Sequence, residues 1–110
     1  MAGVRQVQVT FDCGDPRAVA EFWKAALGYV DPPVPPGFDT WEAFDASLPV
    51  ERQGSTWACQ DPEGVGPRLF FQRVPEGKTV KNRLHLDVTP TEGRTRDEEV
   101  ERLIALGAKP

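Results

Sequence analysis

The sequence predicts a single domain of the α+β class over residues 1–110. Near the N-terminus, alternating apolar and polar residues lead directly into an amphipathic helix, and the same strand–helix order recurs near the C-terminus. Between these two units, two apolar stretches flank a turn-rich connection and predict a β-hairpin. Both predicted helices end in Leu-Gly, at Leu27-Gly28 and at Leu106-Gly107, so the second unit resembles a repeat of the first.

The first predicted strand covers residues 6–13 and has one apolar and one polar face. The apolar residues are Val7, Val9, Phe11 and Cys13, and the polar ones are Gln8, Thr10 and Asp12. A helix should follow, with Asp15 as its N-cap, Pro16 in its first turn and Gly28 as its stop. Its apolar stripe at helical spacing predicts that Phe22 and Trp23 pack between the helix and the sheet.

The middle of the chain is rich in proline and in turns. Residues 31–37 predict an extended loop, because proline continues neither a helix nor a central strand. A short helix through Phe44 should follow, capped by Asp39 or Thr40. Trp41 and Phe44 would then either tuck onto the sheet or form a lid over an apolar pocket. Strands are predicted over residues 55–60 and 68–74, joined by a turn over 61–67 and followed by a polar loop over 75–82.

The C-terminal unit begins with a predicted strand over residues 83–89. Leu84, Leu86 and Val88 alternate there with Arg83, His85 and Asp87. Thr95 and Glu98 have the spacing of a capping box, and acidic residues fill the first turn of the helix that they introduce. This helix should end at Gly107.

Composition and charge exclude several classes of partner. Thirteen basic against seventeen acidic residues give a net charge of −4 and no basic stripe, which argues against nucleic acid and against an anionic membrane surface. The longest apolar run, residues 103–106, is far shorter than the ~20 residues of a transmembrane helix. Residues 1–20 show no secretory signal. Cys13 and Cys59 form no CxxC motif, so we expect both to be reduced, in a cytoplasmic protein.

Several groups of residues resemble the vicinal oxygen chelate superfamily, and within it the glyoxalase-like branch. They are 11–16 (Phe-Asp-Cys-Gly-Asp-Pro) with 20–23 (Ala-Glu-Phe-Trp), 61–64 (Asp-Pro-Glu-Gly), 69–75 (Leu-Phe-Phe-Gln-Arg-Val-Pro) and, most specifically, 81–87 (Lys-Asn-Arg-Leu-His-Leu-Asp). The resemblance implies a βαβββ module over residues 6–75 and the start of a second, incomplete module over residues 82–108. Paired modules of this kind cup a concave site.

The resemblance places the candidate metal ligands at Gln8, Gln72 and His85, with Zn, Ni or Fe as the candidate ions. The residue types argue against a metal, because Gln8 and Gln72 supply no charge to a divalent cation. We therefore expect less than one ion per chain. His85 is alternatively a hydrogen-bonded strand residue or a contact to a ligand. Together with the polar strand face and the hairpin, these positions give the candidate substrate-binding residues Gln8, Thr10, Trp57, Phe70, Gln72 and His85.

Three functions follow as alternatives. The first is a glyoxalase-like enzyme, a lyase or isomerase acting on a small metabolite held in the concave cavity, for which no catalytic residue is identified. The second is a non-catalytic protein that binds a small antibiotic-like molecule, as bleomycin resistance proteins do. The third is an interaction subunit whose site another chain completes. The half-apolar edge at residues 83–89 predicts a homodimer, in which residues 83–107 of one chain pack on the first module of the other.

Overall fold

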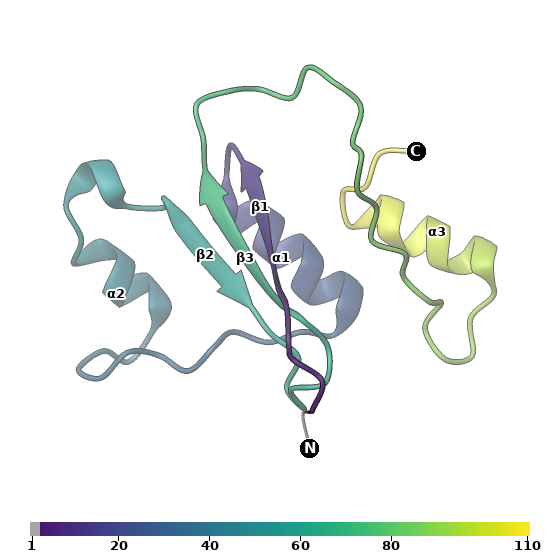
Figure 1. The fold of residues 1–110 in the computed structure, drawn as a ribbon, viewed down its shortest axis with the longest axis horizontal. Helices are drawn as coiled ribbons and strands as arrows, with labels where there is room; N and C mark the ends of the chain where they lie inside the picture. The colour runs from purple at the N-terminus through teal and green to yellow at the C-terminus, as the bar shows by residue number, and fades with distance from the viewer. Residues whose placement is uncertain (1–2) are drawn as a thin grey trace.

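The computed structural model describes residues 3–110 and shows a small α+β fold built on a three-stranded sheet. Helix α1 lies behind the sheet, and α2 and α3 lie on either side of it (Figure 1). No helix within residues 3–110 is long and apolar enough to span a bilayer. The elements, in chain order, are β1 (Gln8–Cys13), α1 (Pro16–Leu27), α2 (Trp41–Ala46), the 3-10 helix η1 (Val50–Arg52), β2 (Thr56–Cys59), β3 (Arg68–Arg73) and α3 (Arg96–Ala105).

The first strand–helix unit forms as its sequence predicts. Along β1, exposed and half-buried residues alternate. The Asp15 carboxylate caps α1 by accepting a hydrogen bond from the Ala18 N–H at 3.2 Å, and Pro16 begins the helix. Gly28 ends it in the left-handed conformation, with φ of 74°, and its N–H donates to the Lys24 carbonyl at 2.9 Å.

The sheet has the order β1-β3-β2, so β3 is its central strand. β1 pairs with β3 in parallel, whereas β2 and β3 form the predicted antiparallel hairpin. The parallel pair is possible because α1 and the long segment after it carry the chain back to the other side of the sheet. Figure 1 shows this return, with α1 behind the strands.

A fourth strand of the implied βαβββ module is not formed within residues 3–110. Val30 instead makes an isolated bridge with Gln60, next to β2, through two reciprocal backbone hydrogen bonds of 2.8 and 2.9 Å. The prolines that begin at Pro32 are the physical reason, because they cannot donate to a ladder and so end the pairing after one residue. The structure therefore corrects this part of the prediction.

The core lies between α1 and the sheet. Its fully buried members are Ala20 on α1, Cys59 on β2, and Leu69 and Phe71 on β3. Trp23 packs against this cluster but is only half-buried, and its ring stacks on Phe11 with a centroid distance of 5.9 Å. The predicted packing of Trp23 is therefore confirmed, although the centre of the core is Phe71. The same prediction for Phe22 is wrong: one residue earlier on the helix, its side chain points about 100° away from that of Trp23, and it lies outside this cluster.

The predicted short helix forms as α2. It ends at Ala46, two residues beyond the predicted end at Phe44. Of the two candidate caps, Thr40 is the one used, because its hydroxyl accepts from the Ala43 N–H at 3.0 Å. The following 3-10 helix η1 was not predicted. Arg73 ties it to the end of β3 by donating to the carbonyls of Gln53 and Glu51, each at 2.9 Å.

Residues 83–89 are not a strand, contrary to the prediction. The segment runs beside α3 without pairing to β1, β2 or β3 (Figure 1). Leu84 is 71% exposed and His85 is also exposed. Alternating apolar residues make a strand only where a neighbouring strand accepts and donates the ladder hydrogen bonds, and no such neighbour lies beside this segment among the described residues.

Helix α3 forms with the predicted capping box, in which Thr95 and Glu98 each accept from the other's backbone N–H. Glu99, only 4% exposed, accepts from the Thr91 N–H and from Arg102. The hydrogen bonds from Thr91, together with Arg102, lower the pKa of Glu99 to about 2. Arg102 also donates to the Ala25 and Ala26 carbonyls at 3.0 and 2.8 Å. It therefore ties α3 to the C-terminal end of α1.

Candidate functional site

The face of the sheet opposite α1 is open and carries the polar residues of β1. The strand register places side chains of β1, β3 and β2 next to one another in three rows across this face. The rows are Gln8 with Arg68, Thr10 with Phe70 and Ala58, and Asp12 with Gln72 and Thr56. Because α1 covers the other face, this is the only side of the sheet on which a ligand could contact several strands at once.

Two side-chain hydrogen bonds order the open face. Arg68 donates from Nη1 to Oε1 of Gln8 at 2.6 Å, and Gln72 donates from Nε2 to Oδ1 of Asp12 at 2.7 Å. The Arg68 guanidinium also lies 5.8 Å from the centroid of the Phe70 ring. The ion pairs among residues 3–110 use other cations, so Arg68 has an amide and an aromatic ring as neighbours but no carboxylate.

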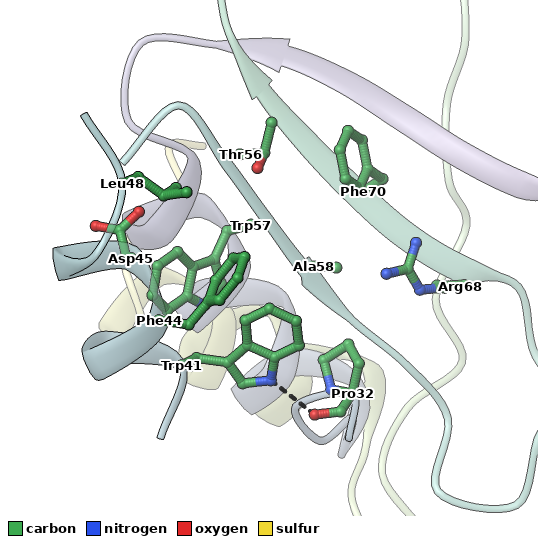
Figure 2. Close-up of a pocket in the computed structure, with 10 residues that line it drawn as sticks. All are labelled: Pro32, Trp41, Phe44, Asp45, Leu48, Thr56, Trp57, Ala58, Arg68 and Phe70. Atoms are coloured by element: carbon green, nitrogen blue, oxygen red, sulfur yellow. Dashed lines mark hydrogen bonds between the residues drawn. The ribbon is translucent and has the colours of Figure 1, made fainter. Parts of the chain in front are cut away.

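A pocket of about 80 Å³ opens where the β2 side of this face meets α2 (Figure 2). Its apolar lining comes from α2 and the turn after it, and from the two hairpin strands. These residues are Trp41, Phe44, Leu48, Trp57, Ala58 and Phe70. Three polar side chains, those of Asp45, Thr56 and Arg68, complete the lining together with Pro32. Such a lining, mostly apolar with few polar groups, is typical of small-molecule sites.

Side-chain contacts hold α2 over this pocket. The Trp41 indole N–H donates to the Pro32 carbonyl at 2.7 Å, as the dashed line in Figure 2 shows. Arg17 on α1 pairs with Glu42 on α2 at 2.6 Å, and its guanidinium lies 5.0 Å from the centroid of the Trp57 ring. The wall of the pocket formed by α2 therefore depends on contacts that link α1, α2 and β2.

A family profile described as a glyoxalase-like domain matches residues 8–110, nearly the whole chain. The chain belongs to the glyoxalase-like domain family, within the vicinal oxygen chelate superfamily. Searches of curated proteins and of solved structures gave no match. Membership points to a protein that binds or processes a small molecule.

The glyoxalase-like chain brings most of the predicted binding residues to the open face or to the pocket. Phe70 lines the pocket from the open face. Trp57 also lines the pocket, but its partner across the ladder is the buried Phe71, so Trp57 is only 8% exposed and belongs to the core as well. Gln8, Thr10 and Gln72 lie on the open face outside the pocket. His85 lies in the unpaired segment over residues 83–89 and does not line the pocket.

The three candidate metal ligands do not fit a divalent ion in this arrangement. In the register of β1 and β3, Gln72 lies four residues beyond the partner of Gln8, a separation of about 13 Å. Oε1 of Gln8 already accepts from the Arg68 guanidinium, whose positive charge opposes a cation at that oxygen. Within residues 3–110, no three His, Cys, Asp or Glu side chains are grouped closely enough to hold a metal.

Neither cysteine is activated as a nucleophile in the described structure. Burial raises the pKa of the Cys59 thiol to about 11 and also raises the pKa of Cys13. Both side chains therefore stay protonated near neutral pH, where a thiol is a poor nucleophile.

Sequence reasoning missed Arg68 as a site residue. The signal was available, because Arg68, Phe70 and Gln72 alternate along one strand and must share a face. The contribution of Leu48 and Thr56 to the pocket had no comparable signal, because it depends on how α2 packs against β2.

Proposed function

We propose that this glyoxalase-like protein binds a small organic metabolite in the pocket between α2 and β2 and on the open face beside it. The observation that carries the proposal is the pocket itself, whose aromatic lining ends at a guanidinium on the open face. Apolar walls supply affinity by excluding water, and a few polar groups at the mouth fix the orientation of a ligand.

The predicted binding residues take distinct parts in this proposal. Phe70 and Trp57 would contact the apolar part of the ligand, whereas Gln8, Thr10 and Gln72 would contact a polar part lying over β1 and β3. That His85 contacts the ligand stays a prediction, since this contact requires residues 83–89 to lie against the open face.

Of the functions that the sequence left open, binding without metal-dependent catalysis is the better supported. The charge of Arg68 at Gln8, and the neutral amide of Gln72, disfavour a divalent cation and favour a ligand with acceptor groups. Lyase or isomerase chemistry would have to proceed with protein side chains as its acids and bases.

Filling the pocket should weaken ligand binding strongly. A library of small metabolites is titrated while tryptophan fluorescence is recorded, since Trp41 and Trp57 both line the pocket. We expect at least one compound to bind the wild type, and Ala58→Leu to weaken that binding more than about tenfold because the added isobutyl group occupies the pocket.

The matched control is Ala43→Leu, the same substitution on an exposed position of α2 that does not line the pocket. Unfolding midpoints of both variants check that the fold is kept. Binding that survives Ala58→Leu, or a library without any binder, contradicts the proposal.

We further propose that the protein forms a homodimer. Leu84, Val100 and Ile104 are 71%, 46% and 41% exposed, and a second chain would cover these apolar side chains of the C-terminal unit. Light scattering should give about twice the chain mass of 12.2 kDa, and Ile104→Glu should shift it to one chain mass. A wild-type mass of one chain, with a melting temperature independent of protein concentration, would contradict the proposed dimer.

A further inference from the structure

The pocket offers several aromatic partners to a ring-shaped group. Trp41 and Phe44 meet edge to face, with an interplanar angle of 87° and a centroid distance of 5.6 Å, and Trp57 lies against the same space. Figure 2 shows these three rings gathered on one side of the pocket. Aromatic pairs gain free energy beyond the burial of their area when rings stack offset or meet edge to face.

The size of the pocket limits how such a ring enters. Its volume of about 80 Å³ is roughly half that of an apolar cavity of about 150 Å³ that holds benzene. A single ring therefore enters edge first and only in part, and a substituent on its outer edge remains at the mouth. At the mouth, Arg68 reaches toward Ala58 from the side opposite the three rings (Figure 2).

Arg68 is suited to recognise a carboxylate at that place. Among the described residues, only its Nη1 atom has a side-chain partner, the neutral oxygen of Gln8 at 2.6 Å. None of the ion pairs within residues 3–110 includes Arg68. The remaining N–H groups of its planar fork match the two oxygens of a carboxylate.

The acidic side chain at the pocket, Asp45, lies on the side opposite Arg68 (Figure 2) and makes no ion pair with it within residues 3–110. Oδ1 of Asp45 accepts from the Gly54 N–H at 2.9 Å, a contact that closes the turn between α2 and β2. A cationic ligand would meet the Arg68 charge, whereas an anionic one would be attracted by it.

We propose that the ligands of this pocket are aromatic carboxylates, with the ring against Trp41 and Phe44 and the carboxylate on Arg68. This inference rests on the proposed function, because it names the chemical class that the same pocket takes.

Three small probes of similar size separate the parts of this proposal. Benzoate carries ring and charge, benzamide carries the ring without the charge, and cyclohexanecarboxylate carries the charge without the aromatic ring. Titrations followed by tryptophan fluorescence should show benzoate binding about tenfold more tightly than benzamide, the size of a charge-assisted hydrogen bond. Benzoate should also bind about threefold more tightly than cyclohexanecarboxylate.

The role of Arg68 is tested with Arg68→Gln, which keeps a hydrogen-bond donor and removes the charge. This variant should bind benzoate and benzamide with equal affinity, because the charge that distinguishes the two probes no longer has a partner. Arg52→Gln, a matched change on the exposed 3-10 helix η1, should keep the tenfold preference.

Each outcome decides between the two proposals. Equal binding of benzoate and benzamide to the wild type, or a preference that survives Arg68→Gln, overturns the carboxylate assignment while the proposed function stands. Tighter binding of cyclohexanecarboxylate overturns the aromatic part alone. If none of the probes binds and no library compound does, the proposed function fails and this inference fails with it.

Discussion

Replacing Phe71 with alanine is expected to lower the free energy of unfolding by about 3–5 kcal/mol. Phe71 is fully buried on the central strand β3, and its ring stacks on Phe11 with a centroid distance of 5.2 Å. It also pairs with Trp57 across the hairpin, so truncation leaves a cavity bounded by rigid rings that cannot collapse into it. For a domain of this size, such a loss is a large part of the total stability.

Urea denaturation of the wild type and the variant measures this effect. Phe70→Ala is the matched control, because it is the same substitution one residue earlier on β3, on the opposite and only half-buried face. It should cost clearly less. Equal costs for the two substitutions would contradict the assignment of β3 faces on which both the core and the site depend.

Gly66→Ala is expected to cost about 1–3 kcal/mol, the usual range for forcing an extra methyl group into a filled space. A Cβ at Gly66 would lie 2.4 Å from the hydroxyl oxygen of Tyr29, which itself donates to the Pro67 carbonyl at 2.8 Å. The Gly66 N–H donates to Asp61 at 2.7 Å, so the backbone cannot move away without losing that bond. The methyl group therefore displaces Tyr29.

A double-mutant cycle isolates this contact. In a Tyr29→Phe background the hydroxyl is absent, and Gly66→Ala should then cost much less than in the wild type. Gly77→Ala serves as a control, since a Cβ there meets nothing within 4 Å. Additive costs for Tyr29→Phe and Gly66→Ala would show that another contact is responsible.

The first strand–helix unit and the third helix could be predicted because their signals are local. At the ends of α1, the signals from Asp15, Pro16 and Gly28 act on backbone groups within four residues. At the start of α3, Thr95 and Glu98 each accept a hydrogen bond from the other's backbone N–H, which is equally local. The hairpin over β2 and β3 was predicted for a similar reason, since its strands flank a turn-rich connection. The polar alternation of β1 correctly placed Gln8 and Thr10 on an open face.

The site was only partly predictable, because a pocket depends on packing between distant segments. Trp41 and Phe44 were foreseen as either a tucked loop or a lid, and it took the contacts of Trp41 with Pro32 and of Glu42 with Arg17 to place α2 beside β2. Likewise, the amide of Gln8 looked like a free metal ligand until the register put Arg68 next to it.

By itself, the sequence determined helices α1 and α3 and the residue that caps the start of each, because caps and apolar stripes act within a few turns of the chain. It also determined the two faces of β1, because side chains alternate along an extended backbone. Only the tertiary structure decided that β1 pairs in parallel with β3 and that Val30 supplies a single bridge in place of a strand. It also decided that residues 83–89, with the alternation of a strand, stay unpaired. The physical reason is that a strand exists only through hydrogen bonds to a neighbour, and the neighbour is chosen by the packing of the whole chain.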